Sequence, residues 1–356
     1  MKAENINIAE YLDAAEQSGV VKLPMQDGEF YLVSPRVRTT GEDSIFSKST
    51  PLLQPPLSRL AYSDRTAWLM AALSELAYIP FEKDQESRAK LIFALTEADM
   101  VLEAIFNNDV KGTQAFLARR EQQFRVLVFR GTEAELDDIK TDLDARFFRT
   151  PHGMAHEGFI TAYQCVADEI VAALNQHPDQ GTLPFLITGH SLGGALATVA
   201  SMDLEDKILV SACYTYGSPR VGTAEWSDAL KTPVYRVVNG ADAVPMLPGS
   251  ALLRFILVTI CKIPVLSLLK GLINTFLQAG FVGYQHVGDM RFLDGHGTDA
   301  ALKSGSAGTM SRIKCVVIDT LLKCLLVFNP KPFAQDHRIA HYRTKLQVIA
   351  EKRNQG

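Results

Sequence analysis

A serine at the apex of a glycine-flanked turn is the side chain in this sequence best placed for covalent chemistry. The motif reads Gly189-His190-Ser191-Leu192-Gly193 and follows a short apolar run, Phe185–Ile187. Glycine two residues away on each side leaves room for the strained backbone that lifts such a hydroxyl above a sheet. We therefore predict a strand, a sharp turn and a helix, with Ser191 as a nucleophile at the helix N-terminus. The structural alternative is a small-residue turn that only packs a helix against a sheet.

A serine hydroxyl is a weak nucleophile unless a base takes its proton and an acid orients that base. In this strand–turn–helix architecture both groups follow the serine along the chain, on loops after later strands. Asp242 lies in the loop Asn239–Pro245, directly after an apolar strand predicted over Tyr235–Val238. Because that loop leaves the sheet at the edge where Ser191 emerges, Asp242 is the candidate acid. An aspartate that only caps a turn is the alternative.

The candidates for the base are His286, His296, His337 and, as a weaker fourth, His341. His296 lies in a glycine-flanked polar turn and is the least constrained. His286 precedes a strand predicted over Met290–Leu293, where a histidine more often makes a structural hydrogen bond. His337 stands just before a predicted C-terminal helix, and a loop-to-helix junction can deliver an imidazole to a cleft. The residues alone favour His337 and leave the others open.

Alternating strands and helices predict an α/β fold with a mostly parallel central sheet and helices on both faces. Residues 1–60 are rich in proline and irregular in pattern, which indicates an N-terminal extension packed on the core. Residues 61–350 are expected to form a single domain with an apolar insertion at 249–283. Helices are predicted over Asp64–Tyr78 and Phe159–Leu174, and strands over Thr113–Leu117, Phe124–Phe129, Ile208–Tyr216 and Val234–Val238.

The apolar insertion departs from the usual globular pattern. Between Ala251 and Gly283 the only charged residues are Arg254, Lys262 and Lys270. No part of it combines the length and apolarity of a membrane-spanning helix. It predicts buried capping helices, a surface that contacts a bilayer or a lipid droplet, or a lid over a lipid-binding cleft. The apolar stretch 315–328 has the same two interpretations.

Composition excludes several classes of protein. Hydrophobic residues make up 47% of the 356 residues, which excludes extensive disorder, and a net charge of −4 without a basic tract excludes a nucleic-acid partner. Five scattered cysteines in apolar settings predict buried free thiols rather than disulfides or a metal site. No cleavable signal peptide is visible at the N-terminus. We therefore expect a cytoplasmic protein, in peripheral contact with a membrane if the insertion binds lipid, with signal-independent export left open.

Further motifs surround the serine turn in a defined order. They are Phe129-Arg130-Gly131-Thr132, Asp138, Asp142-Leu143, His156-Glu157-Gly158-Phe159, Tyr216-Gly217-Ser218-Pro219-Arg220-Val221-Gly222, Asp242-Ala243-Val244-Pro245 and Tyr284-Gln285-His286-Val287-Gly288. Together with the serine turn this set resembles the class 3 (fungal-type) lipase family of the α/β-hydrolase superfamily.

The resemblance implies an α/β-hydrolase fold and a site made of Ser191, Asp242 and His337. It makes His286 structural, places the oxyanion hole at Thr132 and the backbone N–H of Leu192, and leaves Arg130 as an ion-pair partner. It also suggests that residues 145–151, with two aromatics between arginines, form a mobile flap that touches lipid; a buried aromatic pair is the alternative.

The activity implied is hydrolysis of carboxylic esters of lipids, most simply triacylglycerol, without a cofactor or metal. Phospholipase A1 and short-chain carboxylesterase are the near alternatives. An alternative of another class is a catalytically silent, membrane-associated scaffold that keeps the hydrolase fold. The sequence indicates no oligomeric state.

Overall fold

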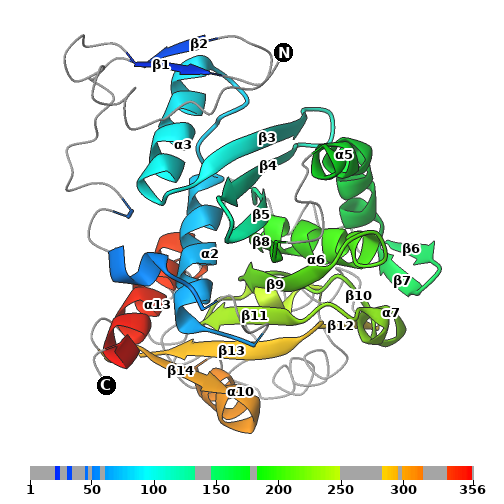
Figure 1. Ribbon diagram of the computed structural model, residues 1–356. Coiled ribbons are helices and arrows are strands. Elements are labelled where there is room, and N and C mark those ends of the chain that lie inside the picture. The colour runs from blue at the N-terminus through cyan, green and yellow to red at the C-terminus, as the bar shows by residue number, and fades with distance from the viewer. Residues whose placement is uncertain are drawn as a thin grey trace.

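An eight-stranded sheet runs through the centre of the protein (Figure 1). The computed structural model describes residues 21–24, 30–33, 45–46, 50–56, 61–132, 146–176, 183–248, 283–295, 299–315 and 335–354. The sheet has the order β14-β13-β11-β9-β8-β5-β4-β3. Its strands are β3 (Val101–Asn108), β4 (Thr113–Arg120), β5 (Phe124–Phe129), β8 (Phe185–His190), β9 (Val210–Tyr216), β11 (Val234–Asn239), β13 (Asp289–Asp294) and β14 (Ala301–Ser304).

The five central strands are parallel to one another. β5 pairs with β8, β8 with β9, β9 with β11 and β11 with β13 in parallel register, while β3, β4 and β14 add antiparallel edges. Parallel strands are buried on both faces, so their sequences are continuous runs of apolar residues. β5 shows this directly, since every one of its residues is buried. The mostly parallel sheet predicted from the sequence is confirmed.

Helices cover both faces of the sheet, as predicted. α2 (Asp64–Leu76) and α13 (Ile339–Asn354) lie side by side on one face, at the left of Figure 1, and α5 (Glu157–Asn175) and α6 (Leu192–Leu204) lie on the other. Side chains of β5 alternate between the two layers because successive strand residues point to opposite faces. Val126 packs in the core beneath α2 and α13, and Leu127 packs in the core beneath α5 and α6. The described residues also form the helices α3 (Gln85–Glu97), α7 (Ala224–Ala229) and α10 (Gly305–Lys314).

A second, smaller sheet lies beside the first. It has the order β12-β10-β7-β6 and is built from β6 (Phe147–Thr150), β7 (Gly153–His156), β10 (Gly222–Thr223) and β12 (Tyr284–Gln285). The aromatic stretch expected as a flap or as a buried pair is β6. Phe147 stacks on Tyr284 with ring centroids 4.4 Å apart, whereas Phe148 is 38% exposed. The two aromatics therefore do not form a buried pair with each other, because alternate strand residues face opposite sides.

Part of the N-terminal extension packs on the core. Phe46 lies edge-on against Trp68 of α2 with ring centroids 6.0 Å apart, and Leu52 of η2 (Thr50–Leu53) is fully buried in the same cluster. β1 (Val21–Pro24) and β2 (Phe30–Val33) form an antiparallel pair. The boundary at residue 60 and the single domain over 61–350 stay predictions.

The outcome for the apolar segments and for the cysteines differs from that for the sheet. The apolar insertion at 249–283 lies outside the described residues except for Gly283, as does 315–328 except for Cys315. Among the described helices, none has the length and apolarity needed to cross a bilayer. The expectation of buried thiols is wrong for Cys165, which is exposed, because it lies on the outer face of the amphipathic helix α5. Cys213 is buried and free.

Candidate active site

The glycine-flanked turn has the geometry that its sequence predicts. Ser191 lies between β8 and α6 with φ of 56° and ψ of −128°, a strained backbone for a residue with a side chain. A Cβ at Gly189 would lie 2.2 Å from the carbonyl oxygen of Gly193, and a Cβ at Gly193 would lie 2.4 Å from that of Phe129. Glycine is therefore required on both sides of the turn by close backbone contacts.

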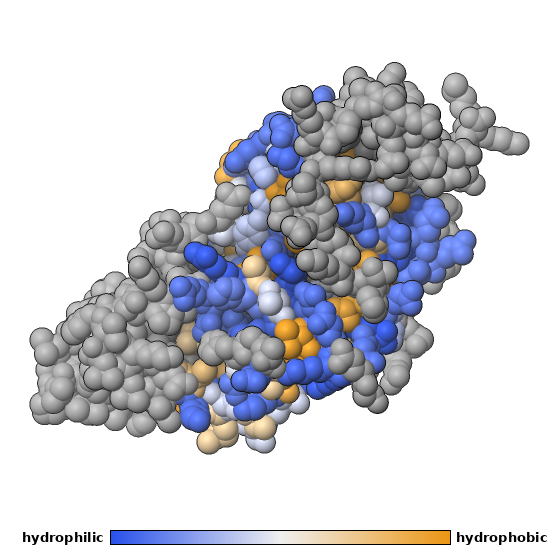
Figure 2. All heavy atoms as spheres, turned by 90° about the vertical axis from the view of Figure 1, so that its left-hand side faces the viewer, coloured by the Kyte–Doolittle hydropathy of each residue, from blue (hydrophilic) through white to orange (hydrophobic). Residues whose placement is uncertain are grey.

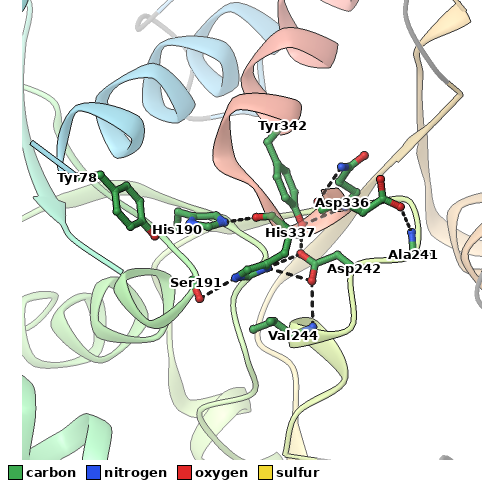
Figure 3. Close-up of polar contacts among 10 residues, drawn as sticks. Tyr78, His190, Ser191, Ala241, Asp242, Val244, Asp336, His337 and Tyr342 are labelled. Carbon is green, nitrogen blue, oxygen red and sulfur yellow. Dashed lines mark hydrogen bonds and ion pairs between the residues drawn. The ribbon is translucent and has the colours of Figure 1, made fainter. Parts of the chain in front are cut away.

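The side chain of His337 contacts Ser191, although the two residues are 146 positions apart in the sequence (Figure 3). Its Nε2 lies 2.8 Å from Ser191 Oγ, and its Nδ1 lies 3.0 and 2.9 Å from the two carboxylate oxygens of Asp242. An ionised carboxylate can only accept, so Nδ1 carries the hydrogen and Nε2 is left to accept from the serine hydroxyl. The three predicted side chains thus form a continuous hydrogen-bonded chain, with the imidazole in the tautomer that a general base needs.

The carboxylate of Asp242 is held from several sides. Asp242 has no exposed surface, and its Oδ1 accepts from the backbone N–H of Val244 at 2.9 Å. The hydroxyl of Tyr342, on α13, donates to Oδ2 at 2.5 Å and accepts from the backbone N–H of Asn239 at 3.2 Å. Burial and the charge of Asp242 raise the pKa of Tyr342 well above its ordinary value, so the phenol stays a donor. These contacts fix the acid's orientation.

The loop that carries His337 is tied to the loop that carries the acid. Asp336 accepts from the backbone N–H of Ala241 through Oδ2 at 2.8 Å, and its carbonyl oxygen accepts from Asn239 Nδ2 at 2.8 Å. Asn239 in turn accepts from Lys345 Nζ on α13 at 2.7 Å. The C-terminal helix and the end of β11 are therefore joined at the point where His337 and Asp242 meet (Figure 3).

His190, the residue before the serine, fixes His337 from the other side. Its Nε2 lies 2.6 Å from the carbonyl oxygen of His337, and its Nδ1 lies 2.6 Å from the hydroxyl of Tyr78. A carbonyl can only accept, so Nε2 donates and Nδ1 accepts from Tyr78. Burial, and then the proximity of His337, lower the pKa of His190 well below its ordinary value. His190 therefore stays neutral beside the imidazole of His337.

Of the two residues expected at an oxyanion hole, Leu192 directly follows the serine and Thr132 follows a strand end that contacts the serine turn. Leu192 is the first residue of α6, where backbone N–H groups have no acceptor within the helix. Thr132 follows Gly131, and a Cβ at Gly131 would lie 3.2 Å from Ser191 Cβ and 2.5 Å from the carbonyl oxygen of His190. The strand end before Thr132 thus passes directly against the serine turn.

The other histidine candidates do not join this chain of hydrogen bonds. His286 Nε2 donates to the carbonyl oxygen of Pro245 at 2.6 Å, and burial followed by nearby arginines lowers its pKa well below the ordinary value. His341 is exposed on α13, and His296 lies outside the described residues. These contacts are those of a structural histidine, and the choice of His337 over His286 as the base stays a prediction.

Arg130 also has a structural contact set. Its Nη1 and Nη2 lie 2.7 and 2.6 Å from the two carboxylate oxygens of Glu82, which makes a bidentate ion pair. The guanidinium also donates to backbone carbonyls at the end of α2 and lies over the ring of Phe81 at 4.6 Å. It therefore anchors the strand end before Thr132 rather than pointing at the serine.

Sequence reasoning missed Tyr342, His190 and Tyr78. Helical spacing can place Tyr342 on the buried face of the C-terminal helix, but it does not show which group the hydroxyl contacts. No described group of three or more His, Cys, Asp or Glu residues is placed to hold a metal ion. Ser191 and Asp242 have no exposed surface and His337 is 8% exposed.

Comparison with known proteins agrees with this geometry. Residues 126–251 match the protein family described as "Lipase (class 3)". A secreted mono- and diacylglycerol lipase from Fusarium solani is 43% identical over 97 residues, covering 26% of this chain and 29% of that one. A lipase from Rhizomucor miehei is 33% identical over 151 residues, covering 39% and 42%. The chain spans less than half the length of these relatives.

A solved structure of the Rhizomucor miehei triacylglyceride lipase superposes with a TM-score of 0.52 at 22% identity, over 70% of this chain and 87% of that one, which supports the α/β-hydrolase fold. The expected cytoplasmic location is contradicted, since relatives from Fusarium solani and Penicillium cyclopium are secreted lipases and point to an extracellular one. The matched motifs, the fold and the serine turn agree, so residues 126–251 are similar to the class 3 lipase family.

Proposed function

We propose that this protein is a serine hydrolase that cleaves carboxylic ester bonds of lipids, with triacylglycerol as the first candidate substrate. The observation that carries the proposal is the hydrogen-bonded chain from Ser191 through His337 to Asp242. The match of residues 126–251 to the class 3 lipase family supports the substrate class. The relatives include mono- and diacylglycerol lipases and a triacylglyceride lipase, so a lipid ester is the common chemistry of the group.

In the proposed mechanism Ser191 Oγ attacks the ester carbonyl while His337 Nε2 takes its proton. Asp242 stabilises the imidazolium that forms, and His337 then returns the proton to the leaving alcohol. Water attacks the acyl-enzyme by the same route and releases the fatty acid. The backbone N–H groups of Leu192 and Thr132 stabilise the oxyanion, and losing one such donor typically costs about 3 kcal/mol of transition-state stabilisation. The reaction requires no cofactor or metal.

Peripheral contact with a lipid surface is part of the proposal and rests on the sequence. Residues 251–283 carry three cations and no acidic residue among many apolar ones. On the side of the molecule in Figure 2, the described surface is mainly hydrophilic and its apolar residues form small separate areas. Replacing Arg254, Lys262 and Lys270 by glutamine should weaken binding to anionic vesicles by about 10²-fold, at about 1 kcal/mol per cation. Unchanged flotation with vesicles would contradict lipid contact through this segment.

The direct test is hydrolysis of p-nitrophenyl butyrate and palmitate by the wild type and by Ser191→Ala. We expect kcat to fall by at least about 10⁴-fold in the variant. Ser201→Ala is the matched control, because Ser201 is a buried serine on α6 whose hydroxyl donates within its own helix to Ala197 at 2.8 Å. Equal inactivity of wild type and variant on all chain lengths would favour the silent scaffold.

Two further measurements sharpen the assignment. His337→Ala should lose activity to the level of Ser191→Ala, whereas His286→Gln should keep it after correction for the folded fraction. Near-normal turnover in His337→Ala would remove that residue from the mechanism. Product identification on triacylglycerol, diacylglycerol and phosphatidylcholine then separates a triacylglycerol lipase from a phospholipase A1.

A further inference from the structure

A group of cationic side chains lies on the α10 face of the sheet, away from the serine. Arg236 of β11 is in register with Met290 of the neighbouring strand β13, so the two side chains share one face. Arg312 of α10 contacts that same methionine, with its Nη1 3.9 Å from Met290 Sδ. Arg312 also acts electrostatically on Arg236, so the two guanidinium groups lie within range of each other on this face.

Arg220 and His286 complete the group, and both hold the segment that follows the acid. Arg220 Nη1 donates to the carbonyl oxygens of Met246 at 2.6 Å and Pro248 at 2.5 Å, and His286 Nε2 donates to that of Pro245. These carbonyls belong to or follow the short helix η3 (Val244–Met246), which begins two residues after Asp242. Asp242 and this cationic group are thus on two sides of one short turn.

Electrostatic effects show that the four side chains share one environment. Burial, followed by Arg312 and Arg220, lowers the pKa of Arg236 to about 9. Burial, followed by Arg312, lowers the pKa of Arg220 to about 10. The same three arginines lower the pKa of His286, after burial. All three guanidinium groups nevertheless stay charged at neutral pH, so their mutual repulsion is present in the folded protein.

Among the described residues, the carboxylates that act on this positive charge already have other partners. Asp242, which acts on Arg312, is hydrogen-bonded to His337 and Tyr342. The Nε and Nη1 of Arg236 and the Nη2 of Arg312 are buried N–H groups without a hydrogen-bond partner there, and Arg236 is only 9% exposed. The carboxylate that acts on Arg236 is that of Asp289, which already forms an ion pair with Arg291 at 2.5 Å. The sequence from 249 to 282 contains no acidic residue to serve as a counter-charge.

Buried N–H donors without an acceptor are rare in native proteins, and a buried unpaired charge is strongly destabilising. We propose that Arg220, Arg236 and Arg312 form a binding site for an oxyanion, namely a phosphate group, beneath the turn that carries Asp242. His286 borders this site but is not a ligand, because its single N–H is already donated to Pro245. Planar guanidinium groups match the oxygens of phosphate in a bidentate arrangement, which would satisfy the free donors of Arg236 and Arg312. The anion would offset the repulsion that these side chains impose on the turn after the acid.

The phosphate can be a free ion or part of a lipid head group, and the experiment distinguishes the two. The full chain carrying Ser191→Ala is titrated calorimetrically with sodium phosphate, and separately with dihexanoyl phosphatidic acid kept below its micelle concentration, at constant ionic strength. Using the Ser191→Ala protein makes the result independent of hydrolysis, so failure of this proposal and failure of the proposed function are distinguishable.

We expect saturable binding at one site per chain in at least one of the two titrations. Arg312→Gln should weaken it at least about tenfold, the effect of losing a charge-assisted hydrogen bond. Lys314→Gln should leave it unchanged, because Lys314 is an exposed cation on the same helix. Arg312 is itself partly exposed, so its variant is expected to fold, which circular dichroism checks.

Binding of inorganic phosphate identifies a free-ion site, and binding of the lipid alone identifies a head-group site. A lack of saturable binding in both titrations would overturn the proposal. Equal affinities of Arg312→Gln and Lys314→Gln would overturn it too, since binding would then reflect only the overall charge of the protein.

Discussion

Tyr342→Phe tests whether the contact between α13 and the acid contributes to turnover as well as to stability. The change removes one hydroxyl, which donates to Asp242 Oδ2 at 2.5 Å and accepts from the backbone N–H of Asn239 at 3.2 Å. The ring itself remains and keeps its edge-to-face contact with Tyr216, at 6.1 Å between centroids. The perturbation is therefore confined to two hydrogen bonds.

Both lost bonds contribute to the expected magnitude. A hydrogen bond to a charged group is worth about 1.5–3 kcal/mol, and a buried N–H left without an acceptor, here that of Asn239, costs about 1–3 kcal/mol. Allowing for partial relaxation, we expect the free energy of unfolding to fall by about 2–4 kcal/mol. Asp242 keeps the N–H of Val244 and the imidazole of His337, so kcat should fall about ten- to hundredfold, less than the roughly 10⁴-fold effect of neutralising such an acid.

The assay is the separate measurement of kcat and KM on p-nitrophenyl butyrate, together with urea unfolding followed by circular dichroism. Tyr163→Phe is the matched control. Tyr163 is also a buried tyrosine whose hydroxyl donates to a carboxylate, that of Asp203 at 2.8 Å, but it lies on α5, on the opposite face of the sheet from α13. We expect the control to lose stability and keep kcat. If Tyr342→Phe behaved in the same way, with normal kcat, a positioning role for Tyr342 would be refuted.

Three further predictions follow from single contacts. Gly217→Ala should reduce kcat about 10²-fold or more, because φ is +57° and the new Cβ would lie 2.7 Å from Asp242 Oδ2. The control is Gly112→Ala, where φ is +62° but the new Cβ would meet open space. It should lower the free energy of unfolding by only about 1 kcal/mol and leave activity unchanged. The pKa of His286 in the folded state lies well below its ordinary 6.5, so the unfolded chain binds the proton first and the free energy of unfolding falls as pH drops below about 6.5. Urea unfolding at about pH 8 and about pH 5.5 should therefore show a smaller loss of stability in His286→Gln than in the wild type. An equal loss in the two proteins would contradict this prediction. Glu82→Gln should lower the free energy of unfolding by about 3 kcal/mol, because it leaves the buried Arg130 with a neutral partner, and a change below 1 kcal/mol would contradict a structural ion pair.

The central strands were predictable because burial on both faces requires apolar runs. The strand Phe124–Phe129 was predicted with the bounds that the structure has, and the helix predicted over 64–78 ends two residues earlier, at Leu76. The smaller sheet was not predictable, since strands such as Gly222–Thr223 have two residues and show no periodicity. α3 was also not predicted, because few of its positions are buried and its apolar stripe is narrow.

The sequence by itself determined the nucleophile turn and the loop of the acid. Both depend on local sterics and chain order: Gly189 and Gly193 are required within the same short segment as Ser191, and Asp242 directly follows a strand. Only the tertiary structure decided which histidine reaches the serine. His337 lies 146 residues away, and several histidines were compatible with the spacing, until the packing of α13 against α2 and β11 brought its Nε2 to 2.8 Å from Ser191 Oγ. Contacts made by side-chain ends, such as the hydroxyl of Tyr342 on Asp242, depend on that packing, because a one-dimensional pattern shows which face of a helix is buried but not which atom it meets.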